Sequence, residues 1–279
     1  MPRNASTILK LIALPLLFFS VFFLVPLGVV LVSSLLDKSS AQPSLINYIS
    51  ILADGYHWEV ILTTFRLGLS TTAICLLLAY PLAWYLVRIV RSSAWRRLCI
   101  IILILPLFTS NIVRSFGWMV MLGRTGMVND ILRSLGLIER PVRFIGTELG
   151  ILIGLVYILL PFAVLSIGTA LSRMDKSLER ASQDLGATSG QTFFHVTLPL
   201  SLPGVASGAI MVFALAVSAY VTPALLSGGK VTVLSMLIYQ QYSTVFNFNY
   251  GGALSIVLLA LTLTLVGIAN HLGRVRGER

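Results

Sequence analysis

Charged residues are scarce in this sequence. They make up 11% of the 279 residues, whereas 57% are hydrophobic, and the mean hydropathy is +0.92. About a quarter of the residues in a soluble domain are normally charged. A water-soluble chain of this length could not bury so much apolar surface. The composition therefore excludes a soluble enzyme, a disordered tail and a secreted disulfide scaffold, and it predicts an integral membrane protein.

Residues that bind metals or catalyse reactions are also few. The two cysteines, Cys75 and Cys99, lie far apart in apolar stretches, and the three histidines are scattered. We interpret the cysteines as small buried hydrophobic residues, and we predict no metal site, no bound cofactor and no catalytic residue. The sequence contains no GxxxxGK[ST] phosphate-binding loop, so we predict that this chain is not itself an ATPase.

Apolar stretches long enough to cross a membrane, which takes about 20 mostly apolar residues, occur along the whole chain. The first carries no charge and is longer than the apolar region of a signal peptide, so we interpret it as a retained helix. Prolines lie within several stretches, and neighbouring helices can satisfy the backbone groups that they free. The six predicted spans are 11–36, 60–87, 98–122, 149–171, 202–226 and 250–271.

The distribution of Lys and Arg predicts which ends of the spans face the cytoplasm. Six spans put both termini on one side, together with the second–third loop and the fourth–fifth loop. That side holds twelve Lys and Arg, the opposite side holds six, and two lie within spans. The positive-inside rule then places both termini in the cytoplasm. The net charge of +10 is thus a signal of topology, and we predict no nucleic-acid binding.

The fourth–fifth loop, residues 172–201, is patterned. It contains two short amphipathic segments, each preceded by a residue that can cap a helix, and a glycine that suits the left-handed end of the first helix. We predict a two-helix elbow at the cytoplasmic surface. The residues concerned are Asp175 or Ser177 as first cap, Gly186 as terminator, Thr188 or Ser189 as second cap, and Pro199 and Pro203, which bracket the start of the fifth span.

This loop resembles the EAA loop of ABC importer permeases. The family pattern is Glu-Ala-Ala, three residues, Gly, nine residues, an aliphatic residue, any residue and Leu-Pro. Here Gly186 is followed by nine residues and then by Val196-Thr197-Leu198-Pro199. The three leading positions are Arg180-Ala181-Ser182, with Glu179 one place earlier, so an arginine occupies the position of the family's glutamate. Further segments that resemble the spermidine/putrescine permease group are 79–83, 105–118, 126–130 and 155–162.

The resemblance implies an all-α integral membrane protein with the six transmembrane helices of the type I ABC importer permease fold, located in the bacterial inner membrane. The implied organisation is a cytoplasmic N-terminus (1–10), a first helix (11–36), a permease core (60–271) and a cytoplasmic C-terminus (272–279). The implied partners are a second permease, two copies of an ABC ATPase carrying ATP-Mg, a periplasmic or extracellular solute-binding protein, and membrane lipids. The implied ATPase-coupling residues are Leu178, Glu179, Arg180, Ala181, Ser182, Asp184, Leu185, Gly186 and Ala187.

Polar groups within the spans are candidates for a translocation path, because isolated charge is unfavourable in lipid. Arg114 lies about midway along the third predicted span, with Asn111 and Trp118 on either side. Arg114 could instead be a structural residue bonded to backbone carbonyls at a broken helix, or lie closer to the outer surface. The fifth span offers aromatic and hydroxyl side chains that could line the path or serve only in packing. These are Phe213, Ser218, Tyr220 and Thr222.

The cargo is less well determined than the family. The resemblance implies a polyamine-like solute, yet no Asp or Glu lies centrally in any predicted span to attract a cation. Arg114 would suit an anionic or other small organic cargo, such as phosphonate, sulfate, an opine or an amino-acid derivative. An ion-coupled secondary transporter is a further alternative. The lack of membrane-centre carboxylates and of an internal repeat disfavours it.

One short segment is similar to part of an ATPase rather than a permease. Leu226-Ser227-Gly228-Gly229-Lys230 resembles the start of the ATPase signature sequence. Because it follows the outer end of the fifth span and no phosphate-binding loop accompanies it, we interpret it as a Gly-Gly turn that ends a helix.

Overall fold

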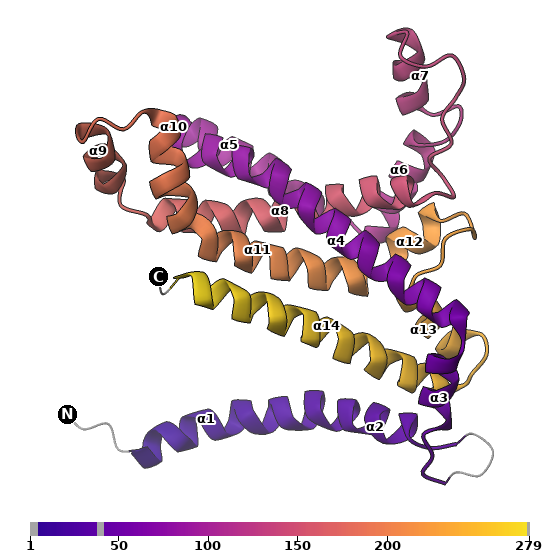
Figure 1. The fold of residues 1–279 in the computed structure, drawn as a ribbon. Helices are drawn as coiled ribbons and strands as arrows, with labels where there is room; N and C mark the ends of the chain where they lie inside the picture. The colour runs from indigo at the N-terminus through magenta and orange to yellow at the C-terminus, as the bar shows by residue number, and fades with distance from the viewer. Residues whose placement is uncertain (1–4, 38–41, 278–279) are drawn as a thin grey trace. The chain divides into compact units, whose positions relative to one another are not determined.

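The computed structural model describes residues 5–37 and 42–277, and it describes side chains in 12–37 and 42–271. Regular structure in these ranges is helical (Figure 1), apart from an isolated β-bridge between Leu36 and Pro43. The prediction of an all-α protein is confirmed. Of the predicted terminal segments, 1–10 and 272–279, residues 1–4 and 278–279 lie outside the described residues.

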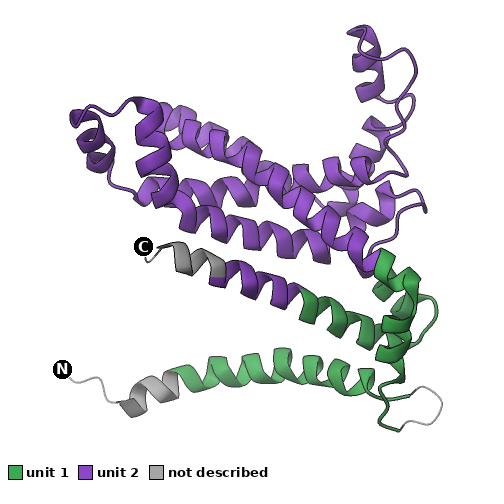
Figure 2. Ribbon diagram, in the orientation of Figure 1, with its two compact units in different colours: residues 1–59, 237–261 green, residues 60–236, 262–279 purple. Residues whose placement is uncertain are grey.

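The chain divides into two compact units, residues 1–59 with 237–261 (unit 1) and residues 60–236 with 262–279 (unit 2), which Figure 2 shows in different colours. The helices in chain order are α1 (Ala5–Phe19), η1 (Ser20–Leu24), α2 (Val25–Ser34), α3 (Ile46–Ala53), α4 (Gly55–Trp84), η2 (Tyr85–Ile89), α5 (Ser93–Ile104), η3 (Leu105–Phe108), α6 (Asn111–Met121), α7 (Met127–Ser134), α8 (Glu148–Arg173), α9 (Lys176–Asp184), α10 (Ser189–Thr192), η4 (Phe193–Thr197), α11 (Leu198–Ser218), α12 (Val221–Leu226), α13 (Leu234–Ser243) and α14 (Phe248–Gly277).

Within the described residues, five helical stretches are long and apolar enough to cross a membrane. They are Ile12–Ser34, Gly55–Ile89, Glu148–Arg173, Ser189–Ser218 and Phe248–His271. A sixth span results if Ser93–Phe108 and Asn111–Met121, which meet at an angle of 99°, are counted together. The structure thus has five spans, or the predicted six if the bent pair is one span.

The third predicted span, 98–122, is not a straight helix, because the chain bends between α5 and α6. Pro106 lies in the short 3-10 helix η3, and Thr109 then adopts an extended conformation with ψ 151°. The Ser110 hydroxyl accepts a hydrogen bond from the Ile112 N–H at 3.3 Å and so starts a new helix. Arg114 therefore lies in the first turn of α6 rather than midway along a span.

The fifth predicted span, 202–226, is also displaced. Its helix begins upstream at Ser189 and runs without interruption through η4 to Ser218, so Pro199 and Pro203 lie inside the helix rather than bracketing its start. The chain then breaks at Ala219, whose ψ is 126°, before α12. The Ser235 hydroxyl donates to the Ala219 carbonyl at 2.7 Å, which satisfies one backbone group at the break.

Helices continue through two prolines by forming a π turn just before each. Proline lacks the N–H that would bond the carbonyl four residues earlier. In η1, which precedes Pro26, the Val25 N–H reaches the carbonyl of Ser20, and in η4, which precedes Pro199, the Leu198 N–H reaches the carbonyl of Phe193. The wider i to i+5 bond keeps the helix continuous.

The core of unit 2 lies between α4, α8 and α11. Small residues let α8 and α11 approach closely: the Ser166 hydroxyl donates to the Gly204 carbonyl at 2.9 Å, and a Cβ on Gly204 would lie 2.3 Å from the Cβ of Ala170. Such small-residue contacts are the usual basis of close helix packing in membranes. The buried apolar side chains around this contact include Cys75, Ala79, Ala83, Ile158, Leu159, Ala163, Val164, Ile167, Leu171, Val212 and Ala216.

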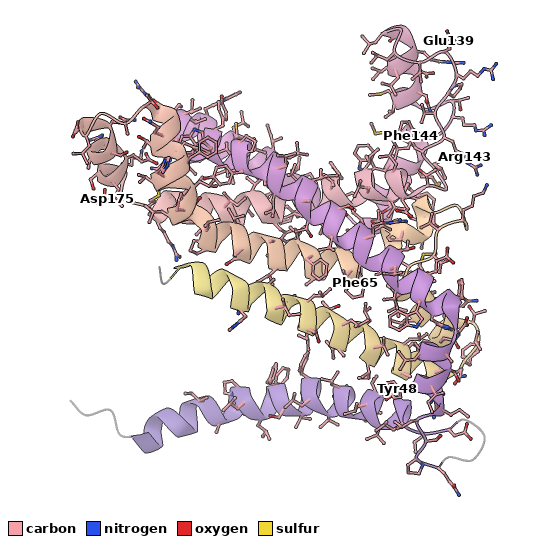
Figure 3. The ribbon with its side chains drawn as sticks, in the orientation of Figure 1. Tyr48, Phe65, Glu139, Arg143, Phe144 and Asp175 are labelled. Atoms are coloured by element: carbon pink, nitrogen blue, oxygen red, sulfur yellow. The ribbon has the colours of Figure 1, made fainter. Side chains whose placement is uncertain are left out.

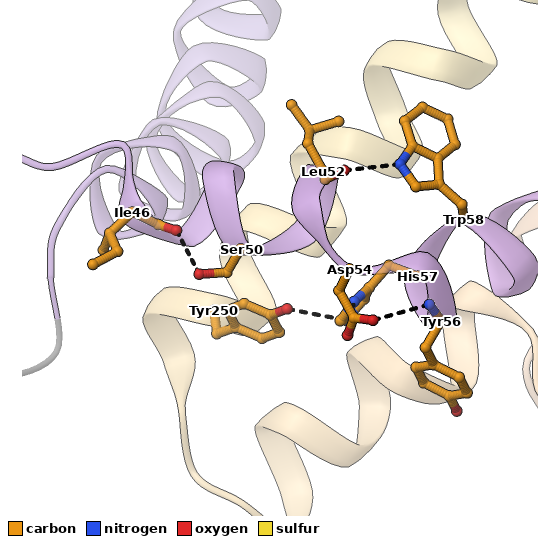
Figure 4. A network of polar contacts seen from close by, with 8 residues as sticks. All are labelled: Ile46, Ser50, Leu52, Asp54, Tyr56, His57, Trp58 and Tyr250. Carbon is orange, nitrogen blue, oxygen red and sulfur yellow. Dashed lines mark hydrogen bonds and ion pairs between the residues drawn. The ribbon is translucent and has the colours of Figure 1, made fainter.

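Unit 1 is held by polar contacts near the ends of its helices. Tyr250 Oη lies 2.9 Å from His57 Nε2, and Asp54 Oδ2 lies 3.0 Å from His57 Nδ1 (Figure 4). Nearby, the Trp58 indole donates to the Leu52 carbonyl at 2.9 Å. Asn47 joins α3 to the end of α2 by donating to the Ser34 carbonyl at 3.1 Å. These contacts order the connection between successive spans.

Candidate functional site

The predicted elbow is present at one end of unit 2 and comprises residues 175–197. Figure 3 places Asp175 at this end, and Arg143 and Phe144 at the opposite end of the same unit. The Asp175 carboxylate caps α9 by accepting from the Ser177 N–H at 2.9 Å. This hydrogen bond also holds the pKa of the Asp175 carboxyl below its usual value. Of the two caps proposed for the first helix, the structure uses Asp175.

The corner of the elbow is a Schellman motif centred on Gly186. Gly186 has a φ of +90°, its N–H donates to the Gln183 carbonyl at 2.9 Å, and the Ala187 N–H donates to the Ser182 carbonyl at 3.1 Å. Thr188 then caps the second arm in a capping box with Gln191: the Gln191 N–H donates to Thr188 Oγ1 at 3.3 Å, and the Thr188 N–H to Gln191 Oε1 at 2.8 Å. Both ends of the corner are therefore fixed by local hydrogen bonds.

Glu179 points inward and ties the elbow to the membrane helices. Its Oε1 lies 3.1 Å from Nη2 of Arg88, in η2 at the end of α4, and accepts a hydrogen bond from Thr197 Oγ1 at 3.0 Å. The side chains are 7% exposed for Arg88 and 17% for Glu179. One carboxylate thus connects the first arm of the elbow, the second arm and the end of α4. We did not identify Arg88 as a site residue from sequence, because it was one of many basic residues near span ends.

The nine predicted coupling residues divide into an inward and an outward group. Besides Glu179, Ser182 faces inward, with its hydroxyl 3.2 Å from Thr192 Oγ1, and Ala187 is half-buried. Leu185 is 90% exposed at the corner and Leu178 is 47% exposed. The other exposed residues are Arg180, Ala181, Asp184 and Gly186. The outward surface therefore combines apolar and charged groups on a rigid support.

The predicted path residues on α6 lie in different environments. Arg114 donates to the Asn111 side chain through Nη2, while its Nε and Nη1 atoms are buried and have no hydrogen-bond partner among the described residues. Trp118 packs edge to face against Tyr157 of α8, with ring centroids 5.3 Å apart. Arg114 thus carries two donors that an additional acceptor could satisfy.

The predicted path residues near the end of α11 are largely involved in packing. Phe213 is 6% exposed and packs against Phe65, with ring centroids 6.0 Å apart. Thr222 is 4% exposed, and its hydroxyl lies 3.1 Å from that of Ser115. Ser218 donates to the Ala214 carbonyl of its own helix at 2.8 Å, and Tyr220 precedes α12 at the break. Their assignment to a path stays a prediction.

Arg66 also has a partner that the sequence did not reveal. An arginine near a span end often extends its head group toward the membrane surface. In the structure Arg66 of α4 pairs with Glu148 at the start of α8. The pair links two spans at the end of unit 2 that is remote from the elbow.

Asn129 organises the loop between α6 and α8. Its side chain is fully buried, donates to the carbonyls of Gly123 at 2.9 Å and Val142 at 3.0 Å, and accepts from the Val142 N–H at 2.8 Å. The sequence contained Asn129 within a segment that resembles the permease group, but nothing there indicated its structural role.

Replacing Asn129 with alanine is expected to loosen this loop. The change leaves the N–H and the carbonyl of Val142 without a partner and removes one of the two hydrogen bonds that the Gly123 carbonyl accepts. Each buried unsatisfied group costs about 1–3 kcal/mol. We expect faster trypsin cleavage at the exposed Arg124 and Arg133, measured on the purified protein in detergent. Asn111→Ala, in which an exposed asparagine is changed, is the control. Equal cleavage rates in the two variants would contradict the assigned role.

Comparison with known proteins identifies the family. Residues 76–272 match the family described as binding-protein-dependent transport system inner membrane component. The chain is 33% identical over 258 residues to the spermidine/putrescine transport system permease protein PotB of Haemophilus influenzae, covering 90% of both proteins. It is 35% identical over 215 residues to PotB of Escherichia coli, covering 77% of both.

The fold is similar to that of a solved ABC transporter chain. In the crystal structure of a bacterial alginate ABC transporter in complex with an alginate pentasaccharide-bound periplasmic protein, one chain superimposes with a TM-score of 0.81 at 19% identity. The alignment covers 98% of this chain and 96% of that chain. The chain described here therefore belongs to the family of binding-protein-dependent transport system inner membrane components, the permeases of ABC importers, which are multi-pass proteins of the bacterial inner membrane.

Proposed function

We propose that this chain is one of two permease subunits of a polyamine-like importer, and that the elbow receives work from a separate ATPase. The observation that carries the proposal is the elbow itself: a doubly capped corner that exposes Leu185 and is tied through Glu179 to the end of α4. A permease without a nucleotide site needs a rigid contact through which ATP-driven closure can move its helices. The second arm continues directly into α11, so movement of the elbow would displace a membrane helix.

The remaining components of the proposal follow from the family. Two ATPase copies would bind ATP-Mg, a second permease would complete the path, and a solute-binding protein would deliver the cargo. The excess of Lys and Arg at the elbow side supports a cytoplasmic position for the elbow and both termini. The opposite end of unit 2, which carries Arg143, would then face the solute-binding protein.

The names of the relatives support a polyamine-like cargo, because both PotB proteins are called spermidine/putrescine permeases. An anionic cargo is the second candidate, and the observation that favours it is the pair of buried, unpartnered donors on Arg114. ATP-driven uptake of labelled spermidine and of a labelled organic anion by the reconstituted complex distinguishes the two.

Replacing Leu185 with aspartate tests the coupling role. If the partner ATPase buries this side chain, its loss removes about 1.5–3 kcal/mol of binding free energy, so we expect the ATPase to associate at least tenfold more weakly. Association is measured by co-purification and by titration of the ATPase onto the permease pair in nanodiscs.

Leu137→Asp is a matched control. Leu137 is 67% exposed and, like Leu185, is adjacent to a left-handed glycine, Gly136 with a φ of +71°, but it lies in the loop after α7. We expect this variant to associate normally. Unchanged association of the Leu185 variant would contradict the coupling role of the elbow.

A further inference from the structure

Two loops at the end of unit 2 remote from the elbow are locked together through glycines. The Gly146 N–H donates to the Leu226 carbonyl at 2.9 Å. Gly146, Gly228 and Gly229 have φ values of +82°, +51° and +74°, which side chains other than glycine rarely adopt. The segment 226–230 is therefore the Gly-Gly turn expected from the sequence, and its closeness to Gly146 fixes where Lys230 lies.

The locked loops bring three cationic side chains together, and we call Arg124, Arg143 and Lys230 the basic patch. Arg124 and Arg143 line one pocket of about 290 Å³. Nη2 of Arg143 and Cδ of Lys230 both lie 3.4 Å from the position that a Cβ on Gly146 would occupy. Residues more than 80 positions apart in sequence are thus neighbours on one surface.

The basic patch lacks counter-charges of its own. All three side chains are exposed, and none forms an ion pair within the described part of the chain. Arg143 is further fixed by donating from Nε to the Ile145 carbonyl at 3.3 Å. Residues 111–147 contain five arginines against two acidic residues, and the nearby Glu148 is already paired with Arg66. Like charges held this close repel one another, so the patch favours an anionic partner.

Three features favour a shaped protein surface over lipid head groups as that partner. The backbone that carries Arg143 and Lys230 is held in hydrogen-bonded loops, whereas cations that bind lipid phosphates commonly extend on long side chains from the end of a span. Arg124 and Arg143 line a concave site whose other lining residues, Leu122, Phe144 and Ile145, are apolar. The basic patch also lies at the end of unit 2 opposite the elbow (Figure 3), where the proposed function places the solute-binding protein.

We propose that the basic patch docks an acidic surface of the solute-binding protein and accelerates its association. This inference rests on the proposed function. Complementary charges at an interface mainly raise the association rate and make it depend on salt. Sequence alone did not reveal the patch, because the outer loops together have no net charge by our span boundaries.

The test measures binding of the purified solute-binding protein to the complete transporter in nanodiscs of phosphatidylcholine, at two salt concentrations. The patch variant is Arg143→Gln with Lys230→Gln. Its matched control is Arg133→Gln with Arg140→Gln, which removes the same charge from exposed arginines of the neighbouring loop. We expect the patch variant to associate at least tenfold more slowly at low salt, with a weaker salt dependence, and the control to change by less than threefold.

The outcomes separate this inference from the proposed function. If the wild-type transporter binds the protein and the patch variant binds at the same rate, or if the control slows equally, the docking role of the basic patch is overturned and the proposed function stands. The same measurement is repeated in nanodiscs that contain 20% phosphatidylglycerol. If the patch variant differs from the wild type only in binding this anionic lipid, the docking role is also overturned. If the wild-type transporter binds no solute-binding protein, both proposals fail.

Discussion

Replacing Arg88 with alanine is expected to reduce coupled transport strongly while leaving the membrane helices folded. The substitution leaves the Glu179 carboxylate, 17% exposed, without its cationic partner. Removing one member of a buried ion pair typically costs about 3–5 kcal/mol, and here that cost falls on the contact that holds the elbow. Thr197 alone cannot replace it, because a neutral hydroxyl supplies a single weaker hydrogen bond. We expect ATP-driven uptake in proteoliposomes to fall at least tenfold.

Two further variants show whether the effect belongs to the ion pair. Arg88→Met with Glu179→Met removes both charges and fills a similar volume, and such replacements are often neutral or stabilising. This double variant should regain at least part of the ATP-driven uptake lost in Arg88→Ala. Arg91→Ala removes an exposed arginine three residues further along the chain and should have little effect. A double variant that behaves no better than Arg88→Ala would show that Arg88 acts through some contact other than Glu179.

Replacing Gly204 with valine is expected to destabilise the core of unit 2. Even the first added carbon would lie 2.3 Å from the Cβ of Ala170 and 3.2 Å from the Ser166 carbonyl oxygen, so α8 and α11 must separate. The separation also weakens the hydrogen bond from Ser166 to Gly204. Overpacking of this kind typically costs about 1–3 kcal/mol and sometimes more. The measurement is unfolding of the purified chain by SDS in mixed micelles.

Gly267→Val controls for the intrinsic effect of valine in a helix. Gly267 also lies inside a spanning helix, α14, but a Cβ there meets nothing within 4 Å. Both variants change helix propensity equally, so the difference in unfolding free energy reports the contact between α8 and α11. Equal stabilities would mean that the two helices can repack around the added side chain.

The elbow shows how far local sequence can predict structure. Residue type predicted the left-handed Gly186 and limited each cap to two candidates, because capping depends on groups within four residues of one another. The structure uses Asp175 rather than Ser177 and Thr188 rather than Ser189. The continuity of the second arm with α11 was not expected. Pro199 and Pro203 suggested a boundary, but a π turn before Pro199 and the membrane environment keep the helix intact.

The broken spans show where local patterns are insufficient. Apolar content predicted helices over 98–122 and 202–226. It could not show where these helices bend or break, because hydropathy does not report the direction of the backbone. The bend at Thr109 and Ser110 and the break at Ala219 follow from hydrogen bonds, one of them from Ser235, which lies 16 residues beyond the break. Because the hydropathy pattern does not show the bend, it predicts Arg114 midway along a span, whereas in the structure Arg114 lies at the start of α6.

The sequence by itself determined the membrane class, the approximate positions of the spans, the form of the elbow and the family. Each of these depends on composition or on residues close together in the chain. Only the tertiary structure decided which charges meet: Arg88 with Glu179, Arg66 with Glu148, and Arg143 with Lys230. An apolar chain has few charged side chains, so each has few possible charged neighbours. Which of them lie together depends on how segments distant in sequence pack, and no local pattern encodes that packing.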